Sequence, residues 1–180
     1  MLFTYEECIE AYKNYYQMRK QIAEHNLFKI ESGIYSNVEY VPVSQVIMKK
    51  YPEAVFTLNS AFYYQRLTDT IPQKYYIQTD KDASKITDER IKQCFDNCRS
   101  MSLGVETIKY NSDDIKVFSK ERLLIELIRN RTKFSFDYYK EIIGSYRKLI
   151  HDLDFQTIEE FANALPKTAL VMNTIQREVL

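Results

Sequence analysis

The ten residues "LFKIESGIYS", Leu27 to Ser36, alternate apolar and polar side chains on both sides of the turn Glu31-Ser32-Gly33. This period of two predicts two short strands, Leu27–Ile30 and Ile34–Ser36. A glycine at the end of the turn suits the left-handed position of a three-residue hairpin loop. A two-stranded hairpin is only marginally stable in water, so this one needs a neighbour against which to bury its apolar side chains.

The residues before the hairpin predict two helices that can act as this neighbour. Thr4 and Glu7 have the spacing of a capping box, and Asn14 can cap a second helix. Apolar side chains recur at helical spacing at Tyr5, Cys8, Ile9 and Tyr12, and again at Tyr15, Met18 and Ile22. The order helix, turn, helix, hairpin is that of the last two helices and the wing of a winged helix-turn-helix. We therefore predict such a domain over residues 1–40.

The opposite face of the second helix is polar, as a helix that enters a DNA groove requires. The candidate DNA-binding residues are Tyr16, Gln17, Arg19, Lys20 and Gln21 on this helix, with Lys29 and Ser32 on the wing. Residues 1–40 hold four basic and six acidic residues, a net charge of −2. Because affinity for DNA depends largely on phosphate neutralisation, one copy should bind weakly. A structural or dimerising winged helix that does not bind DNA is the alternative.

Residues 41–180 predict a mixed α/β domain that ends in a helical bundle, so the fold class is α+β. Ser44 is expected to cap a helix that ends near Tyr51. Short strands are predicted at 54–57, 74–79 and 92–95, a helix at 60–67, and a hairpin around "NSDD" at 111–114. Helices should follow Ser119 and Ser135 and cover 157–165 and 168–179. Gly144 costs its helix about 1 kcal/mol relative to alanine, which suggests a close helix contact there.

The two helices within 119–150 are rich in positive charge, with eight basic and four acidic residues and a net charge of +4. An ordinary solvated helix face is one interpretation of this excess. The functional interpretation is a surface for RNA or for an acidic protein partner. Its candidate residues are Arg129, Arg131, Lys140, Arg147 and Lys148.

Composition excludes several other classes of protein. The 25 basic and 25 acidic residues cancel, so no global field attracts the chain to nucleic acid or to a membrane. No apolar run has transmembrane length, and the start of the chain does not resemble a secretion signal. Three cysteines, an odd number, favour reduced thiols in the cytoplasm. Cys94 and Cys98 have a spacing that can hold a metal, but we expect small buried side chains and no metal or cofactor.

Enzyme signatures are mostly missing from the sequence, and we expect no catalytic residues. There is no glycine-rich phosphate loop, no HExxH and no GxSxG. Asp114-Ile115-Lys116 matches the D-x-K fragment of metal-dependent nucleases, but such triplets arise by chance in a charged chain. A metal-dependent nuclease is therefore kept only as a distant alternative.

Four segments together resemble the AbiEi family of antitoxins. They are the hairpin "LFKIESGIYS", "YPEAVFTLNSAFYYQRLTDTIPQKYYIQT" (51–79), "LGVETIKY" (103–110) and "VFSKERLLIELIRNR" (117–131). The most specific part is Ser60–Pro72, with the pattern S-A-x-Y-x-x-x-L-T-D-x-x-P. The resemblance covers nearly the whole chain. One departure is that the chain begins close to the first of the two predicted N-terminal helices, whereas a full winged-helix module usually has three helices.

This resemblance implies a type IV toxin–antitoxin system, of the kind that acts in abortive infection against bacteriophage. The N-terminal domain would bind inverted repeats in its operator DNA and repress its own operon. The C-terminal domain would counteract a nucleotidyltransferase toxin of the AbiEii type, directly or through the RNA target of that toxin. The alternative is an interaction-only protein whose winged helix does not bind DNA.

Overall fold

The computed structural model describes residues 1–111 and 113–180, apart from the side chains of Cys98 and Arg99. The chain is α+β with two sheets, and it divides into two compact units, Met1–Glu53 and Ala54–Leu180. The boundary that we predict from the sequence, at residue 40, lies 13 residues before the end of the first unit. The reason is the third helix, which packs on the first sheet.

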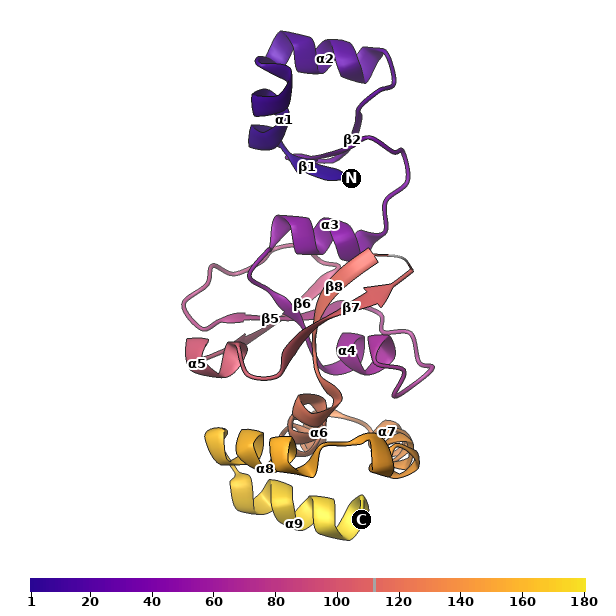
Figure 1. Cartoon of the computed structure of the whole chain (residues 1–180), viewed down its shortest axis with the longest axis vertical. Helices are drawn as coiled ribbons and strands as arrows, with labels where there is room; N and C mark the ends of the chain where they lie inside the picture. Colours follow the sequence, from indigo (N-terminus) through magenta and orange to yellow (C-terminus); the bar gives the residue numbers. More distant parts are fainter. Residues whose placement is uncertain (112) are drawn as a thin grey trace. The chain divides into compact units, whose positions relative to one another are not determined.

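The first unit holds three short strands and three helices (Figure 1). In chain order these are β1 (Leu2–Thr4), α1 (Tyr5–Tyr12), α2 (Tyr15–Ala23), β2 (Phe28–Glu31), β3 (Ile34–Ser36) and α3 (Val43–Lys50). The sheet is antiparallel with the order β1-β3-β2, so the predicted hairpin gains a third strand. Sequence analysis missed β1 because three residues are too few to show a period of two.

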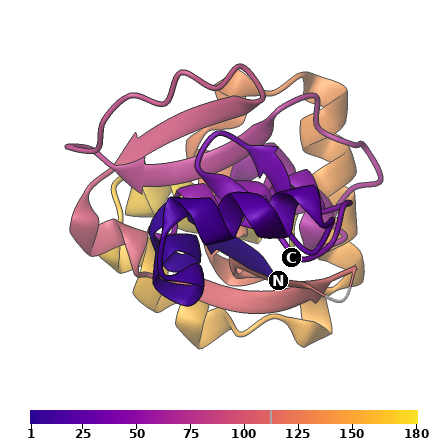
Figure 2. The same cartoon turned by 90° about the horizontal axis from the view of Figure 1, so that it is seen from above.

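Both predicted helix caps are present. The Glu7 amide donates to the Thr4 hydroxyl (3.2 Å) while the Thr4 amide donates to the Glu7 carboxylate (2.7 Å), which completes a capping box. The Gln17 amide donates to the Asn14 side chain at 2.9 Å. Between the caps the chain turns at Lys13, so α1 and α2 run in clearly different directions (Figure 2).

The core of the first unit is small. Cys8, Met18, Leu27 and Tyr35 are buried at its centre. Two members of the predicted stripes, Tyr5 and Tyr15, are instead exposed. A unit of this size covers only the middle of each stripe, and the tyrosines at the helix starts extend past it.

The α3 helix corrects one prediction and explains how the unit is held together. Ser44 does not cap it, because the helix begins at Val43 after Pro42 and Ser44 is buried. Two lysines at the end of α3 form ion pairs with other elements of the unit: Lys49 lies 2.6 Å from Glu7 and Lys50 lies 2.9 Å from Glu31.

The second unit is built on a five-stranded mixed sheet with the order β6-β5-β4-β8-β7. Its strands are β4 (Val55–Phe56), β5 (Tyr75–Asp80), β6 (Ile91–Asp96), β7 (Val105–Tyr110) and β8 (Asp113–Phe118). The β5–β6 and β4–β8 pairs are parallel, and the β4–β5 and β7–β8 pairs are antiparallel. All four strand regions predicted from the sequence are present.

Six α-helices complete the described part of this unit, and the last four pack together at one end of it (Figure 1). The six helices are α4 (Leu58–Tyr64), α5 (Cys98–Met101), α6 (Lys120–Arg129), α7 (Phe136–Lys148), α8 (Phe155–Ala164) and α9 (Thr168–Glu178), and the four that pack together are α6 to α9. Ser119 and Ser135 cap α6 and α7 as predicted. The close contact expected at Gly144 is wrong, since a methyl group there would meet no atom of the described residues within 4 Å.

Candidate nucleic-acid interfaces

The outward face of α2 carries the residues that the sequence predicts for DNA binding. Met18 is completely buried, so the residues around it on the other side of the helix face solvent. The Tyr16 side chain is 76% exposed, and Gln17, Arg19 and Lys20 are exposed as well. The structure therefore brings four of the five helix candidates to one open surface.

Neighbouring side chains limit some of these groups. Lys20 lies 3.7 Å from Glu24, one turn further along α2, and the Arg19 guanidinium lies 5.9 Å from the centre of the Tyr15 ring. Gln21 is only partly exposed, and its amide accepts from Asn26 at 3.2 Å. Tyr16 and Gln17 are thus the candidates with the most open polar groups, whereas Gln21 is held against the end of its own helix.

On the hairpin, Lys29 and Ser32 are both exposed as the prediction requires. Lys29 lies opposite Tyr35 in the β2–β3 register, and Ser32 lies at the turn before Gly33. The acidic neighbour Glu31 is paired with Lys50. A count along the sequence suggests that Lys29 and Glu31 cancel each other. The structure instead pairs Glu31 with Lys50, so the charge of Lys29 is not cancelled within the hairpin.

The two lysines of α3 change the charge balance of the first unit. Glu7 and Glu31 each face a lysine of α3, and the Lys49 hydrogen bond, with that from the Thr4 backbone, lowers the pKa of the Glu7 carboxyl. The first unit, residues 1–53, contains six basic and seven acidic residues, so the net charge of −2 over residues 1–40 becomes −1 for the whole unit.

The five basic candidates of the second unit lie on α6, α7 and the turn between them, and their surroundings differ. Arg129 is mostly buried and lies 2.8 Å from Glu126. Lys140 lies 2.9 Å from Glu178 of α9, and Arg147 donates to the Glu178 carbonyl at 2.7 Å. Arg131 and Lys148 are exposed. Arg129 is therefore a structural residue, whereas the other four are exposed; we call these four residues the basic surface.

Another arginine of α6, Arg122, is buried, and the sequence alone did not single it out. Arg122 is 0% exposed, and its Nη2 lies 2.8 Å from Glu126 and 3.4 Å from Asp96. Its guanidinium carbon is 5.0 Å from the centre of the Phe118 ring. Burial lowers the pKa of Arg122, while Glu126 and Asp96 oppose this effect. The spacing Arg122-x-x-x-Glu126 was the available sequence signal.

The polar side chains of residues 60–72 make internal contacts within the second unit. The Ser60 hydroxyl accepts from the Tyr76 amide (2.8 Å) and so ties α4 to β5. Gln65 donates to the Phe118 carbonyl (3.0 Å) at the end of β8. The Thr68 hydroxyl donates to Glu141 of α7 at 2.5 Å. These polar side chains fix the position of α4, and no part of this network resembles a catalytic arrangement.

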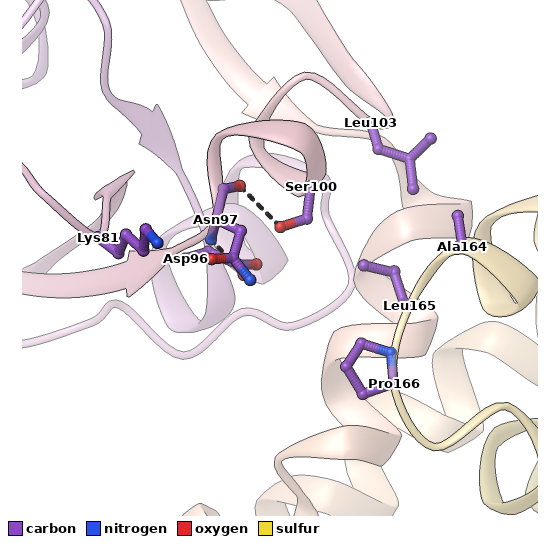
Figure 3. Close-up of a pocket in the computed structure, with 8 residues that line it drawn as sticks. All are labelled: Lys81, Asp96, Asn97, Ser100, Leu103, Ala164, Leu165 and Pro166. Carbon is purple, nitrogen blue, oxygen red and sulfur yellow. Dashed lines mark hydrogen bonds between the residues drawn. The ribbon is translucent and has the colours of Figure 1, made fainter.

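A hollow of about 630 Å³ separates a polar from an apolar wall in the second unit (Figure 3). The polar wall contains Lys81, Asp96, Asn97 and Ser100, and the apolar wall contains Leu103, Ala164, Leu165 and Pro166. The Ser100 hydroxyl donates to the Asn97 carbonyl at 2.8 Å, and Asp96 accepts from Gln78 and Arg122. Both groups are thus engaged in internal contacts rather than arranged as a nucleophile and its base.

The D-x-K triplet of the nuclease alternative lies on β8, where Asp114 and Lys116 are exposed opposite Lys109 and Thr107 of β7. Among the described residues, no three His, Cys, Asp or Glu side chains gather as a metal site would require. Of the Cys94–Cys98 pair, the Cys94 thiol has a pKa raised by burial, and the Cys98 side chain lies outside the described residues.

Comparison with known proteins adds no family assignment. A scan against models of protein families finds no match, and a search of curated proteins finds none that the chain matches. None of the helices in the described ranges has the length and apolar character that a membrane crossing requires.

Proposed function

We propose that this chain is an antitoxin of a type IV toxin–antitoxin system, similar to the AbiEi family. Its first unit would be a winged helix-turn-helix domain that represses its own operon, and its second unit would counteract a nucleotidyltransferase toxin. The proposal assigns no catalytic activity to the chain.

The observation that carries the proposal is the arrangement of the first unit. A strand, two helices and a hairpin follow one another, and the first strand pairs with the last in the order β1-β3-β2. The face of α2 that lies away from the buried Met18 is exposed, as a helix that enters a major groove requires. Gln17 can bond an adenine edge there, and Arg19 and Lys29 can bond phosphates.

A mobility-shift assay on the DNA upstream of the reading frame tests the repressor function. Replacing Tyr16 and Gln17 by alanine should weaken binding to this DNA about tenfold or more, since base contacts contribute about 1–3 kcal/mol each. Tyr40→Ala is the matched control, because Tyr40 is 87% exposed and lies outside α2 and the hairpin. No shift of this DNA at low salt would refute the repressor function and favour the interaction-only alternative.

Growth rescue during toxin expression tests the second unit. Arg131, Arg147 and Lys148 are reversed to glutamate together, and Arg129 is kept because it pairs with the buried Glu126. A control variant carries the same charge change at the exposed lysines Lys81, Lys85 and Lys92. Loss of rescue in the first variant alone supports the basic surface, whereas equal rescue by both folded variants contradicts it.

A further inference from the structure

An exposed aromatic ring lies within the basic surface of the second unit. Phe136 is the first residue of α7 and is 72% exposed. The Lys140 ammonium lies 5.8 Å from the centre of its ring, one turn along the helix. One face of an aromatic side chain is thus open to solvent at the beginning of α7, with a cation beside it.

A second cation, Arg131, lies with Lys140 on the ring of the buried Tyr139, three residues along α7 from Phe136. The Arg131 guanidinium and the Lys140 ammonium lie 5.6 Å and 5.9 Å from the centre of the Tyr139 ring, which is 4% exposed. Such contacts hold flexible cationic side chains near one position. Lys133 is exposed in the 3-10 turn Arg131–Lys133, just before α7. We call Arg131, Lys133, Phe136 and Lys140 the Phe136 surface.

Acidic groups reduce the charge of this surface but do not cancel it. Lys140 shares its ammonium with Glu178 at 2.9 Å, and Asp137 is exposed next to Phe136. The three cations of this surface therefore outnumber these two carboxylates, and the single ring contact of Arg131, with Tyr139, leaves its guanidinium available to an anion. An acidic protein would use the cations but has no particular need for an open aromatic face beside them.

We propose that the Phe136 surface binds single-stranded nucleic acid, with an unpaired base stacked on Phe136 and adjacent phosphates on Arg131, Lys133 and Lys140. Base stacking on aromatic side chains combined with backbone contacts to cations is how single strands are bound without sequence preference. A duplex offers the same phosphates but no free base face, so single strands are preferred. The inference rests on the proposed role of the basic surface and names its ligand.

Fluorescence anisotropy of the full chain with labelled oligomers tests whether the Phe136 surface binds single strands. The oligomers are about twelve nucleotides long, because this length matches the site sizes of proteins that bind single strands. The probes are oligouridylate, oligothymidylate and a duplex of the same length. Phe136→Ala should weaken binding of single strands at least about fivefold, and Phe136→Leu about as much, since leucine keeps the apolar surface but has no ring. Phe136→Tyr should bind like the wild type. Replacing Arg131 and Lys133 by glutamine should lower the slope of log K against log salt by about 0.7 each.

Two matched controls separate this surface from other parts of the chain. Phe95→Ala removes an equally apolar ring that is 51% exposed on β6, and it should leave binding unchanged. Replacing Tyr16 and Gln17 by alanine, which disrupts the proposed operator contact, should also leave single-strand binding unchanged. The two proposals can therefore fail separately.

Three results would overturn the inference. The first is no binding of either single strand at low salt, which is the outcome expected if the partner is an acidic protein. The second is equal binding of the duplex with no effect of Phe136→Ala. The third is loss of single-strand binding with the Tyr16 and Gln17 variant but not with Phe136→Ala. A preference for oligouridylate over oligothymidylate assigns RNA as the ligand, and the reverse preference assigns DNA.

Discussion

The three glycines of the chain offer a sharp test of the packing, because the structure predicts a different result for each when it becomes alanine. Gly104 has φ +71°, and a methyl group there would lie 2.7 Å from the Arg122 Cβ and 2.9 Å from the Phe161 ring. The left-handed backbone costs an alanine about 1–2 kcal/mol, and overpacking costs about 1–3 kcal/mol more. Gly104→Ala should therefore destabilise the second unit by about 2–5 kcal/mol.

The other two glycines serve as internal controls, because they separate the cost of the left-handed backbone from the cost of overpacking. Gly33 has φ +79° but open space around it, so Gly33→Ala should cost the first unit only the backbone term, about 1–2 kcal/mol. Gly144 lies inside α7 with ordinary helical geometry and open space, so Gly144→Ala should stabilise the second unit by about 1 kcal/mol.

Urea denaturation followed by circular dichroism measures these changes. With a slope of about 2 kcal/mol per molar urea, Gly104→Ala should lower the midpoint of the second unit by about 1–2.5 M, and Gly144→Ala should raise it by about 0.5 M. A stable Gly104→Ala variant would refute the close approach of the loop to α6 and α8. A strongly destabilised Gly144→Ala variant would contradict the open space around Gly144 and support the close helix contact that the sequence suggests.

Further predictions concern the ion pairs and the buried thiol. Lys49→Ala should cost the first unit about 0.2–1 kcal/mol at neutral pH in urea titrations. Because Lys49 lowers the Glu7 pKa below its ordinary 4.5, this difference should disappear as the pH falls through the lowered pKa, and a difference that persists in acid would exclude the pair as its cause. Cys8 is fully buried and burial raises its thiol pKa, so alkylation mapped by mass spectrometry should label it only in urea that unfolds the first unit. Arg122→Met should destabilise the second unit by about 3 kcal/mol in the same urea assay, since the buried Glu126 loses a partner; a loss below about 1 kcal/mol would mean that the remaining partners of Glu126 suffice.

Local features of this chain could be predicted from the sequence, and non-local ones could not. The caps at Thr4, Asn14, Ser119 and Ser135 involve residues three apart, so their spacing alone identifies them. The outward face of α2 follows from the period that buries Met18. By contrast, β1 exists only because β3 lies beside it, and no pattern within three residues indicates that pairing. The close contact occurs at Gly104 instead of Gly144 because loop 102–104 folds back onto α6 and α8.

The candidate sites show the same limit in their charges. A count along residues 119–150 treats Arg122 and Arg129 as surface charges, yet both lie against Glu126, one of them fully buried. The sequence identifies which helices are basic, but it does not separate charges that hold the fold from charges that face solvent. Only the contacts with Glu126 and with Glu178 of α9 make that separation.

Under the proposed function, the ion pairs of α3 also affect how strongly one first unit would bind DNA. With Glu7 and Glu31 neutralised by Lys49 and Lys50, the cations at the α2 face and hairpin are Arg19, Lys29 and Lys20, the last of which must be drawn from its pair with Glu24. Three phosphate contacts give a slope of log K against log salt of about −2.7, far below that of a tight specific repressor. Two copies on an inverted repeat double this slope to about −5.4. Under the proposed function, repression therefore requires both half-sites, and an operator cut to one half-site should lose most of its binding at physiological salt.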